Sequence, residues 1–369
     1  MKRLVHLKRL WLLLLAPLGL ALTIAASYSS GFAEWYAVTI YPWLSRIINF
    51  FSSLLPISLA EMALFCLIPL ILLYLFFSIR RIVRQKGDRW YYIGKMILSP
   101  LCAACVLYAS FVLLCGINYH RYPFSQVCGL TVRDSTVEHL QGLCTELAQQ
   151  ASSLREQVAE DENGVMVSSF PDAFQVARES QSCYDKLAGS YPTLPAGYGQ
   201  PKPVMASRLM SYGNITGIYI PFTCEANVNI DVPDYSIPAT MCHELTHLRG
   251  YMREEEANFI AYLACLGSDS PDFRYSGVML ALIHAQNALY DADRDAWRET
   301  VSFLSDGVQR DLAADSAYWD QFEGPVAQIS NQVNDSYLKA NEQEDGVKSY
   351  GRMVDLLLAD YRQRHGILD

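Results

Sequence analysis

Two histidines and a glutamate between positions 243 and 247 have the types and spacing of a hydrolytic metal site. His243 and His247 are four residues apart, and Glu244 directly follows the first histidine. On a helix with 3.6 residues per turn, the two histidines share one face and can bind a single ion. Glu244 is rotated by about 100° from His243, which places it beside the ion. There it can accept a proton from a zinc-bound water, whose pKa the ion lowers to about 7.

The residues around this motif predict the helix that must carry it. Ser236 is a suitable N-cap, and Pro238 falls in the first turn, where a missing N–H costs nothing. Gly250 is expected to end the helix. The alternative is a helix with two surface histidines and no metal, and a third ligand within reach would decide between them. The packing face would consist of Met241, Leu245 and Leu248.

A catalytic zinc ion needs a third protein ligand and leaves its fourth position to water. Arg253, six residues after His247, cannot be that ligand, which excludes the metzincin spacing H-E-x-x-H-x-x-G-x-x-H. Glu254, Glu255 and Glu256 follow at the start of a second predicted helix. A turn between the two helices could bring one of these carboxylates to the ion. Acidic residues in a first turn also suit the helix dipole, so the cluster alone does not identify the ligand.

The stretch "HELTH" followed by "EEEAN" resembles the H-E-x-x-H and E-x-x-A-D pattern of gluzincin-type membrane metallopeptidases. The resemblance implies a zincin-like domain, with Glu254 as the third zinc ligand and Asn258 orienting a ligating histidine. Asn258 stands where the pattern has aspartate, and the gap after His247 is shorter than in those families. Glu256 therefore remains open as the ligand.

Longer stretches resemble an uncharacterised bacterial family of membrane-anchored H-E-x-x-H proteins, DUF3810. They are "GNITGIYIPFTCEANVN", "HELTHLRGYMREEEANFIAYLAC" and "YLKANEQEDGVKSYGRMVDLL". This likeness covers nearly the whole chain and includes the hydrophobic runs near its start. It implies bacterial origin and a zinc site, but no substrate.

Three apolar runs predict a membrane region over residues 1–118. They cover about 10–26, 57–79 and 97–117, close to the roughly 20 residues that a membrane-crossing helix needs. The first run could be a cleaved signal peptide, but its length favours an uncleaved anchor. The aromatic segment between the first two runs is expected to lie along the outer interface, with a fourth crossing as the alternative.

Basic residues predict the orientation of these spans. They concentrate before the first run and between the second and third, which places the N-terminus and that second loop in the cytoplasm. Residues 119–369 are then extracytoplasmic, outside a bacterial cytoplasmic membrane. Residues 1–118 carry a net charge of +8 within a chain total of −9, which leaves −17 on residues 119–369. Such an acidic domain is not expected to bind nucleic acid.

Residues 119–369 are expected to form one helix-rich α+β domain. Helical spacing begins near residue 137 and again over 170–191, a strand fits Gly217–Pro221, and helices follow Pro238. The sequence "GIYIPFTCEANVN" could supply an edge strand that pairs with a peptide substrate, or Glu225 and Asn227 could serve in a turn. Six cysteines permit disulfides, but no paired C-x-x-C spacing predicts a cysteine zinc site.

These features predict a membrane-anchored zinc metallopeptidase with Glu244 as the catalytic base. Its expected partners are a peptide or protein substrate and the lipid bilayer. Two alternatives remain: a zinc amidase that acts on cell-envelope material, and a non-catalytic zinc-stabilised sensor or binding protein. Glu244 argues against the second, because a structural site gains nothing from a base. The sequence does not identify the substrate or the oligomeric state. Five residues are candidates for stabilising an oxyanion: Tyr275, His284, Tyr337, Tyr350 and Arg352.

Overall fold

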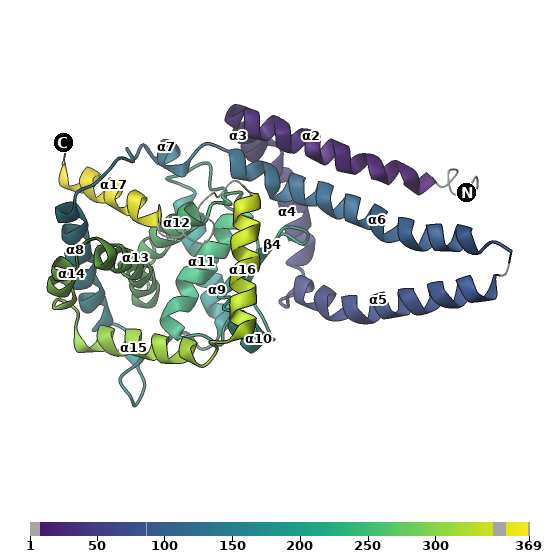
Figure 1. The fold of residues 1–369 in the computed structure, drawn as a ribbon. Coiled ribbons are helices and arrows are strands. Elements are labelled where there is room, and N and C mark those ends of the chain that lie inside the picture. Colours follow the sequence, from purple (N-terminus) through teal and green to yellow (C-terminus); the bar gives the residue numbers. More distant parts are fainter. Residues whose placement is uncertain (1–7, 86, 342–351, 368–369) are drawn as a thin grey trace.

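The computed structural model describes residues 8–85, 87–341 and 352–367. Three apolar helical segments extend from one side of a mostly helical domain (Figure 1). Among the described residues, three segments are long and apolar enough to cross a membrane: Lys8–Tyr28, Leu59–Arg84 and Arg89–His120. The first joins a 3-10 helix (Lys8–Leu14) to α2 (Leu15–Tyr28), the second is α5, and the third joins α6 (Arg89–Leu114) to η2 (Gly116–His120). The structure thus confirms three helical segments with the length and composition that the sequence predicted for membrane spans.

Two short helices, α3 (Ser30–Thr39) and α4 (Tyr41–Ser52), connect the first two spans. At 10 and 12 residues they are too short to cross the hydrocarbon core, so a fourth crossing does not fit. α4 packs against the domain: the Asn49 side chain donates to the Cys224 carbonyl at 2.8 Å and accepts from the Gly199 N–H at 2.6 Å. The predicted division of the chain into residues 1–118 and 119–369 stays a prediction. α4 belongs to the first part by sequence, but it contacts residues of the second.

The rest of the chain forms helices around one hydrophobic core, with two small sheets. In the larger sheet β5 (Glu225–Val228) lies in the centre, parallel to β3 (Lys202–Pro203) and antiparallel to β4 (Gly217–Ile220). β1 (Ala159–Glu160) and β2 (Met166–Val167) form a separate hairpin. The helices are α7 (Phe124–Cys128), α8 (Val137–Arg155), α9 (Ala173–Leu187), α10 (Ser207–Tyr212), η3 (Asp234–Ser236), α11 (Ile237–Leu248), α12 (Glu254–Leu266), α13 (Pro271–Ala292), α14 (Arg294–Val301), α15 (Asp306–Asp320), α16 (Pro325–Ala340) and α17 (Met353–His365).

The predicted helices near residues 137 and 170–191 correspond to α8 and α9, and the predicted strand corresponds to β4. The fold is therefore helix-rich with small sheets, as expected. α11 carries the H-E-x-x-H motif, and its core face packs against α9, α12 and α13 while β4 and β5 lie beside it. The core of the domain runs directly behind the motif, with Met241, Leu245 and Leu248 all buried.

The beginning of α11 differs from the prediction in one respect. Ser236 already has helical backbone angles, as the last residue of η3, and its hydroxyl donates to the Pro233 carbonyl at 2.8 Å. It therefore does not cap α11. Instead, the Ala239 N–H donates to the Ser276 hydroxyl of α13 at 2.9 Å. Pro238 does fall in the first turn, as predicted.

The turn between α11 and α12 depends on Gly250. Its φ of +84° is in the left-handed region that favours glycine. A Cβ at this position would also lie 3.0 Å from the Tyr41 ring and 3.2 Å from the Asn118 amide nitrogen. This reversal brings the first turn of α12 back to the motif on α11, as predicted.

Candidate metal centre

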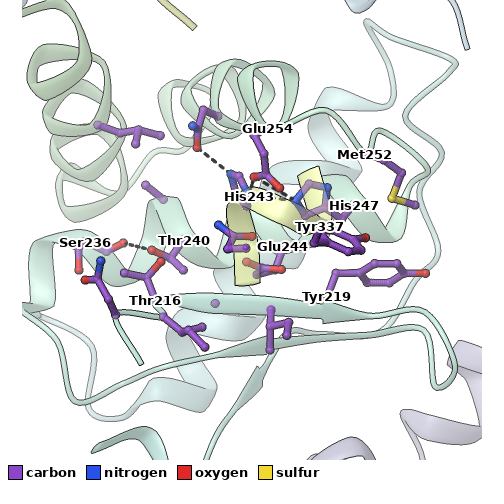
Figure 2. Close-up of a pocket in the computed structure, with 18 of the residues that line it drawn as sticks. Thr216, Tyr219, Ser236, Thr240, His243, Glu244, His247, Met252, Glu254 and Tyr337 are labelled. Carbon is purple, nitrogen blue, oxygen red and sulfur yellow. Dashed lines mark hydrogen bonds and ion pairs between the residues drawn. The ribbon is translucent and has the colours of Figure 1, made fainter. Parts of the chain in front are cut away.

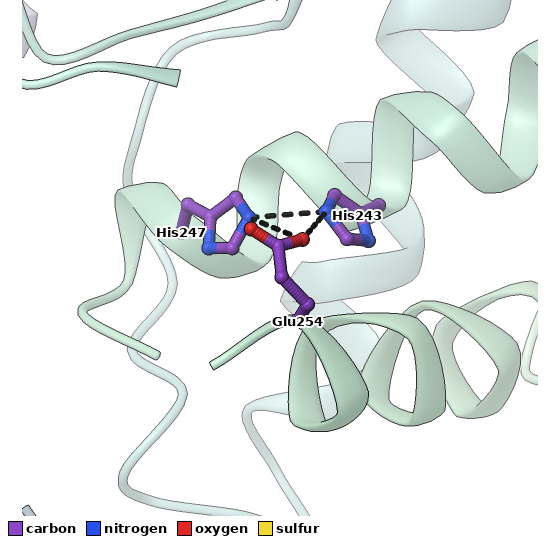
Figure 3. A group of neighbouring side chains, drawn as sticks. All are labelled: His243, His247 and Glu254. Carbon is purple, nitrogen blue, oxygen red and sulfur yellow. Dashed lines mark hydrogen bonds and ion pairs between the residues drawn. The ribbon is translucent and has the colours of Figure 1, made fainter. Parts of the chain in front are cut away.

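His243, His247 and Glu254 converge on one point (Figure 3). The two Nε2 atoms of the histidines are 3.0 Å apart. Glu254 Oε2 lies 3.1 Å from His243 Nε2 and 3.7 Å from His247 Nε2. Among the described residues, these three form the group whose donor atoms could hold a metal ion.

The other ring nitrogens of the histidines are fixed by oxygen acceptors. His243 Nδ1 lies 2.7 Å from Asn258 Oδ1, and His247 Nδ1 lies 2.8 Å from the Tyr251 carbonyl oxygen. Because a carbonyl oxygen can only accept, each Nδ1 carries a proton and donates it. Both Nε2 atoms therefore face Glu254, and each would offer its lone pair to an ion once its imidazole is neutral. Two imidazole nitrogens and a carboxylate oxygen, oriented by outer hydrogen bonds, are a donor set that fits a divalent metal ion.

The charges of the three groups favour a cation between them. Burial alone lowers the pKa of His247, but the adjacent Glu254 carboxylate outweighs it and raises that pKa to about 9. Burial raises the pKa of Glu254, yet the two imidazoles hold it well below its ordinary value. In the metal-free protein the carboxylate thus stabilises a proton on the imidazoles. A metal ion can take the place of that proton.

Metal binding to the metal-free protein is therefore expected to release about one proton at neutral pH, since His247 must lose its proton to bind. Zinc affinity should fall as the pH falls below about 9, where His247 becomes protonated. Calorimetric titration with zinc in buffers of different ionisation enthalpy measures this release. A proton release close to zero at neutral pH would contradict the assignment of His247.

Glu244 lies beside this group, between α11 and β4 (Figure 2). Its side chain is buried, and its Oε2 atom has no hydrogen-bond partner among the described residues. Burial raises the pKa of Glu244 to about 7, although the two nearby histidines partly oppose this. A carboxyl group that titrates near neutral pH is suited to accepting and returning a proton.

Gly217 of β4 makes room for the Glu244 side chain. A Cβ on Gly217 would lie 2.8 Å from Glu244 Cγ and 2.9 Å from Cδ, closer than carbon atoms normally approach. Glu244 can therefore hold its position only because residue 217 lacks a side chain. Sequence reasoning placed Gly217 in a strand but did not connect it with Glu244, because no local pattern links residues so far apart in the chain.

Gly217→Ala is expected to displace the Glu244 carboxylate while leaving the metal ligands in place. The hydrolytic activity predicted from the sequence should fall on the order of 10²-fold, because a displacement of about 1 Å has this effect on the group that accepts the proton. Zinc content should stay near that of the unchanged protein. Gly267→Ala is the matched control, because a Cβ there meets its nearest atom at an ordinary distance of 3.4 Å. Full activity of Gly217→Ala would show that this contact does not position Glu244.

A cavity of about 760 Å³ opens in front of Glu244 and the histidines. One wall is β4, which is an edge strand of the three-stranded sheet in the described part of the chain. Another part of the wall is α16, through side chains such as Asn334 and Tyr337. The end of α6 and the loop residue Met252 contribute to the same cavity. A groove with an edge strand on one side can accept an extended chain.

The remaining acids of α12 point elsewhere. Glu256 accepts hydrogen bonds from the Phe124 N–H at 2.7 Å and from Arg253 at 2.9 Å. Glu255 does not belong to the group of converging donors. Of the three glutamates that the sequence left open, the geometry brings Glu254 to the histidines.

Two of the predicted oxyanion candidates line the cavity, and two do not. Tyr337 and His284 face it. Burial is the larger cause, and the nearby His243 the smaller, that lowers the pKa of His284 to about 4. Tyr275 is buried in the core, where its hydroxyl donates to Asp311 at 2.6 Å. Arg352 precedes α17 and does not line the cavity. Tyr350 lies outside the described residues.

Glu225 has a role that neither sequence hypothesis included. Its carboxylate accepts hydrogen bonds from the Leu59 and Ala60 N–H groups at 3.0 and 2.9 Å, and it pairs with buried Lys202. These N–H groups open α5, so Glu225 caps a predicted membrane span. Asn227 stays within the sheet, donating to the Ile218 carbonyl at 3.4 Å.

The comparisons with known proteins identify the family. A family model described as a protein of unknown function, DUF3810, matches residues 36–358. The chain belongs to the DUF3810 family. No curated protein and no solved structure gives a significant match. The resemblance to DUF3810 is thereby confirmed. The match does not test the resemblance to gluzincin-type metallopeptidases, so the function of this DUF3810 protein has to be argued from the site itself.

Proposed function

We propose that this DUF3810 protein is a membrane-anchored zinc metallopeptidase with a gluzincin-type site. The observation that carries the proposal is the position of Glu244, a buried carboxylate next to the converging donors of His243, His247 and Glu254. Two histidines and one carboxylate are the ligands of catalytic zinc sites that leave a position for water. A purely structural zinc site would use four protein ligands and would have no need of Glu244.

The residues of the site divide the chemistry among them. A zinc ion held by His243, His247 and Glu254 would supply a Lewis acid that makes water more acidic and polarises a carbonyl group. Glu244 would take the proton from the attacking water and pass it to the leaving amine nitrogen. Tyr337 or His284 could donate a hydrogen bond to the charge that develops on the carbonyl oxygen.

The shape of the cavity favours a polypeptide substrate. β4 is an edge strand among the described residues, and its Gly217 lies directly against the Glu244 side chain. An extended peptide can add to such an edge through main-chain hydrogen bonds, which would place its carbonyl groups along the site. This pairing requires no particular side chain in the substrate.

The proposal is tested by combining metal analysis with digestion of a peptide library by the purified full-length protein. One zinc ion per chain and cleavage that a chelator abolishes are expected. Zinc without any hydrolysis would favour the binding or sensing alternative. Release of amide-linked envelope material without peptide cleavage would favour the amidase.

We propose further that the domain lies outside the cytoplasmic membrane. The start of α2 and the loop between α5 and α6 lie at the end of the spans opposite the domain (Figure 1). Basic residues concentrate at that end, which favours a cytoplasmic position for it. A reporter that is active only outside the cytoplasm should give signal when fused after Asp369 and none when fused after Lys86. The reverse pattern would place the site in the cytoplasm.

A further inference from the structure

The polar and apolar faces of α4 are inverted relative to those of a helix on a soluble domain. Its buried face, against the domain, includes Ser45, Asn49 and Ser52. The exposed side chains are large and apolar, with Trp43 74% and Phe50 63% exposed. α4 runs across the direction of the membrane spans at their domain end (Figure 1). A helix with an exposed aromatic face in this place is suited to lie in the membrane interface.

The same helix is in direct contact with the end of the motif helix. The Tyr41 hydroxyl donates to the Leu248 carbonyl at 3.1 Å and lies 3.4 Å from the His247 carbonyl oxygen. It also lies 3.1 Å from the Tyr219 hydroxyl of β4. The Tyr41 side chain therefore connects the end of the motif helix and the edge strand to α4, the helix whose exposed face suits the membrane interface.

The third membrane span forms part of the cavity itself. Phe111, in the last turn of α6, and Cys115, directly after it, line the cavity together with the metal ligands. Cys115 Sγ is 3.7 Å from the sulfur of Met252, which lies in the short loop between His247 and Glu254. Within the third span the uncharged apolar run over about residues 97–117 has the length of one bilayer crossing, and it ends next to Cys115. The cavity therefore reaches the level at which α6 leaves the bilayer.

The rim of the cavity is apolar where it meets this surface. Phe222, after β4, is 43% exposed, and Val333 of α16 is 63% exposed, and both line the cavity. Along α16, Val326 and Ile329 continue the exposed apolar row that ends at Val333. Such a rim next to a membrane-facing helix is compatible with a chain that arrives from the bilayer rather than from bulk water.

From these contacts we infer that the substrate is a membrane-anchored polypeptide that is cut close to the point where it leaves the bilayer. This inference rests on the proposed peptidase function and adds the substrate class. An extended chain advances about 3.3 Å per residue, so a site at this level should reach about the first ten residues after a transmembrane segment. The free edge of β4 favours a polypeptide over a lipid head group, because main-chain pairing needs a peptide backbone.

The test uses full-length protein in liposomes together with two anchored substrates. Each substrate has one transmembrane helix and a randomised segment of about ten residues, as long as the reach derived from the rise per residue. In one substrate the segment directly follows the helix. In the other, a Gly/Ser spacer of about 40 residues separates them, and a flexible chain of this length has an r.m.s. end-to-end distance of about 35 Å. Both substrates are anchored in the same vesicle, so they differ in the distance of the segment from the bilayer and not in membrane anchoring. Mass spectrometry of the products locates each cut.

We expect the membrane-proximal segment to be cut on the order of ten-fold faster than the spaced one, with cuts clustered near the helix. Glu244→Gln protein serves as the control for contaminating peptidases. Equal rates for the two substrates would overturn this inference and leave the peptidase proposal standing. Absence of Glu244-dependent cleavage in both anchored substrates and in the free peptide library would overturn both.

Discussion

Replacing Glu244 by glutamine is expected to lower peptide hydrolysis by about 10²–10⁴-fold, the usual effect of losing a general base. Glutamine keeps the size of the side chain but cannot accept a proton. Since Glu244 is not among the converging donors, zinc content and fold should be retained. The measurement is initial rate and metal content on the same purified samples.

The matched comparison is His243→Ala, which removes a ligand and should lose metal and activity together, with some loss of stability. The pair separates the proton-transfer step from the holding of the ion. If Glu244→Gln retained zinc and worked fully in a cellular assay in which His243→Ala failed, the protein would be a zinc-held binding or sensing module.

Replacing Glu254 by glutamine is expected to strip most of the zinc. Glu254 supplies the negative charge of the group, and its carboxylate stabilises positive charge beside it, as the raised pKa of His247 indicates. The loss of zinc affinity should exceed the roughly 10–100-fold seen when an outer hydrogen bond to a ligand is removed. Equilibrium dialysis against a zinc buffer measures it directly.

Glu255→Gln is the control for this change, because Glu255 lies in the same helical turn but outside the converging group. It should leave zinc content near normal. Glu256→Gln should weaken the hydrogen bonds to Phe124 and Arg253, and so lower the free energy of unfolding rather than zinc affinity. Loss of metal in Glu256→Gln alone would move the ligand assignment two residues along the chain.

The parts of this molecule that the sequence predicted are set by local chemistry. The spacing of His243 and His247 follows from helical geometry, and the left-handed turn at Gly250 follows from the freedom of glycine. The three spans follow from length and hydropathy. Even the return of α12 to the motif could be anticipated, because so few residues separate the two helices.

The parts that could not be predicted depend on contacts between distant segments. Ser236 has the residue type of an N-cap, but η3 continues directly into α11. The hydroxyl of Ser276, on another helix, accepts the Ala239 N–H instead. The sequence around Glu225 suggests a turn residue, whereas in the structure its carboxylate accepts the first N–H groups of α5. The contact of Gly217 with Glu244 also arises only when β4 packs beside α11. No local pattern contains these pairings.

The most direct test of the metal centre is the metal content of full-length protein purified without added zinc, measured by plasma mass spectrometry beside the His243→Ala variant. Two imidazoles and a carboxylate that converge within hydrogen-bonding distance predict one zinc ion per chain, lost in His243→Ala. Less than stoichiometric metal in the unchanged protein, or equal metal in both proteins, would contradict it.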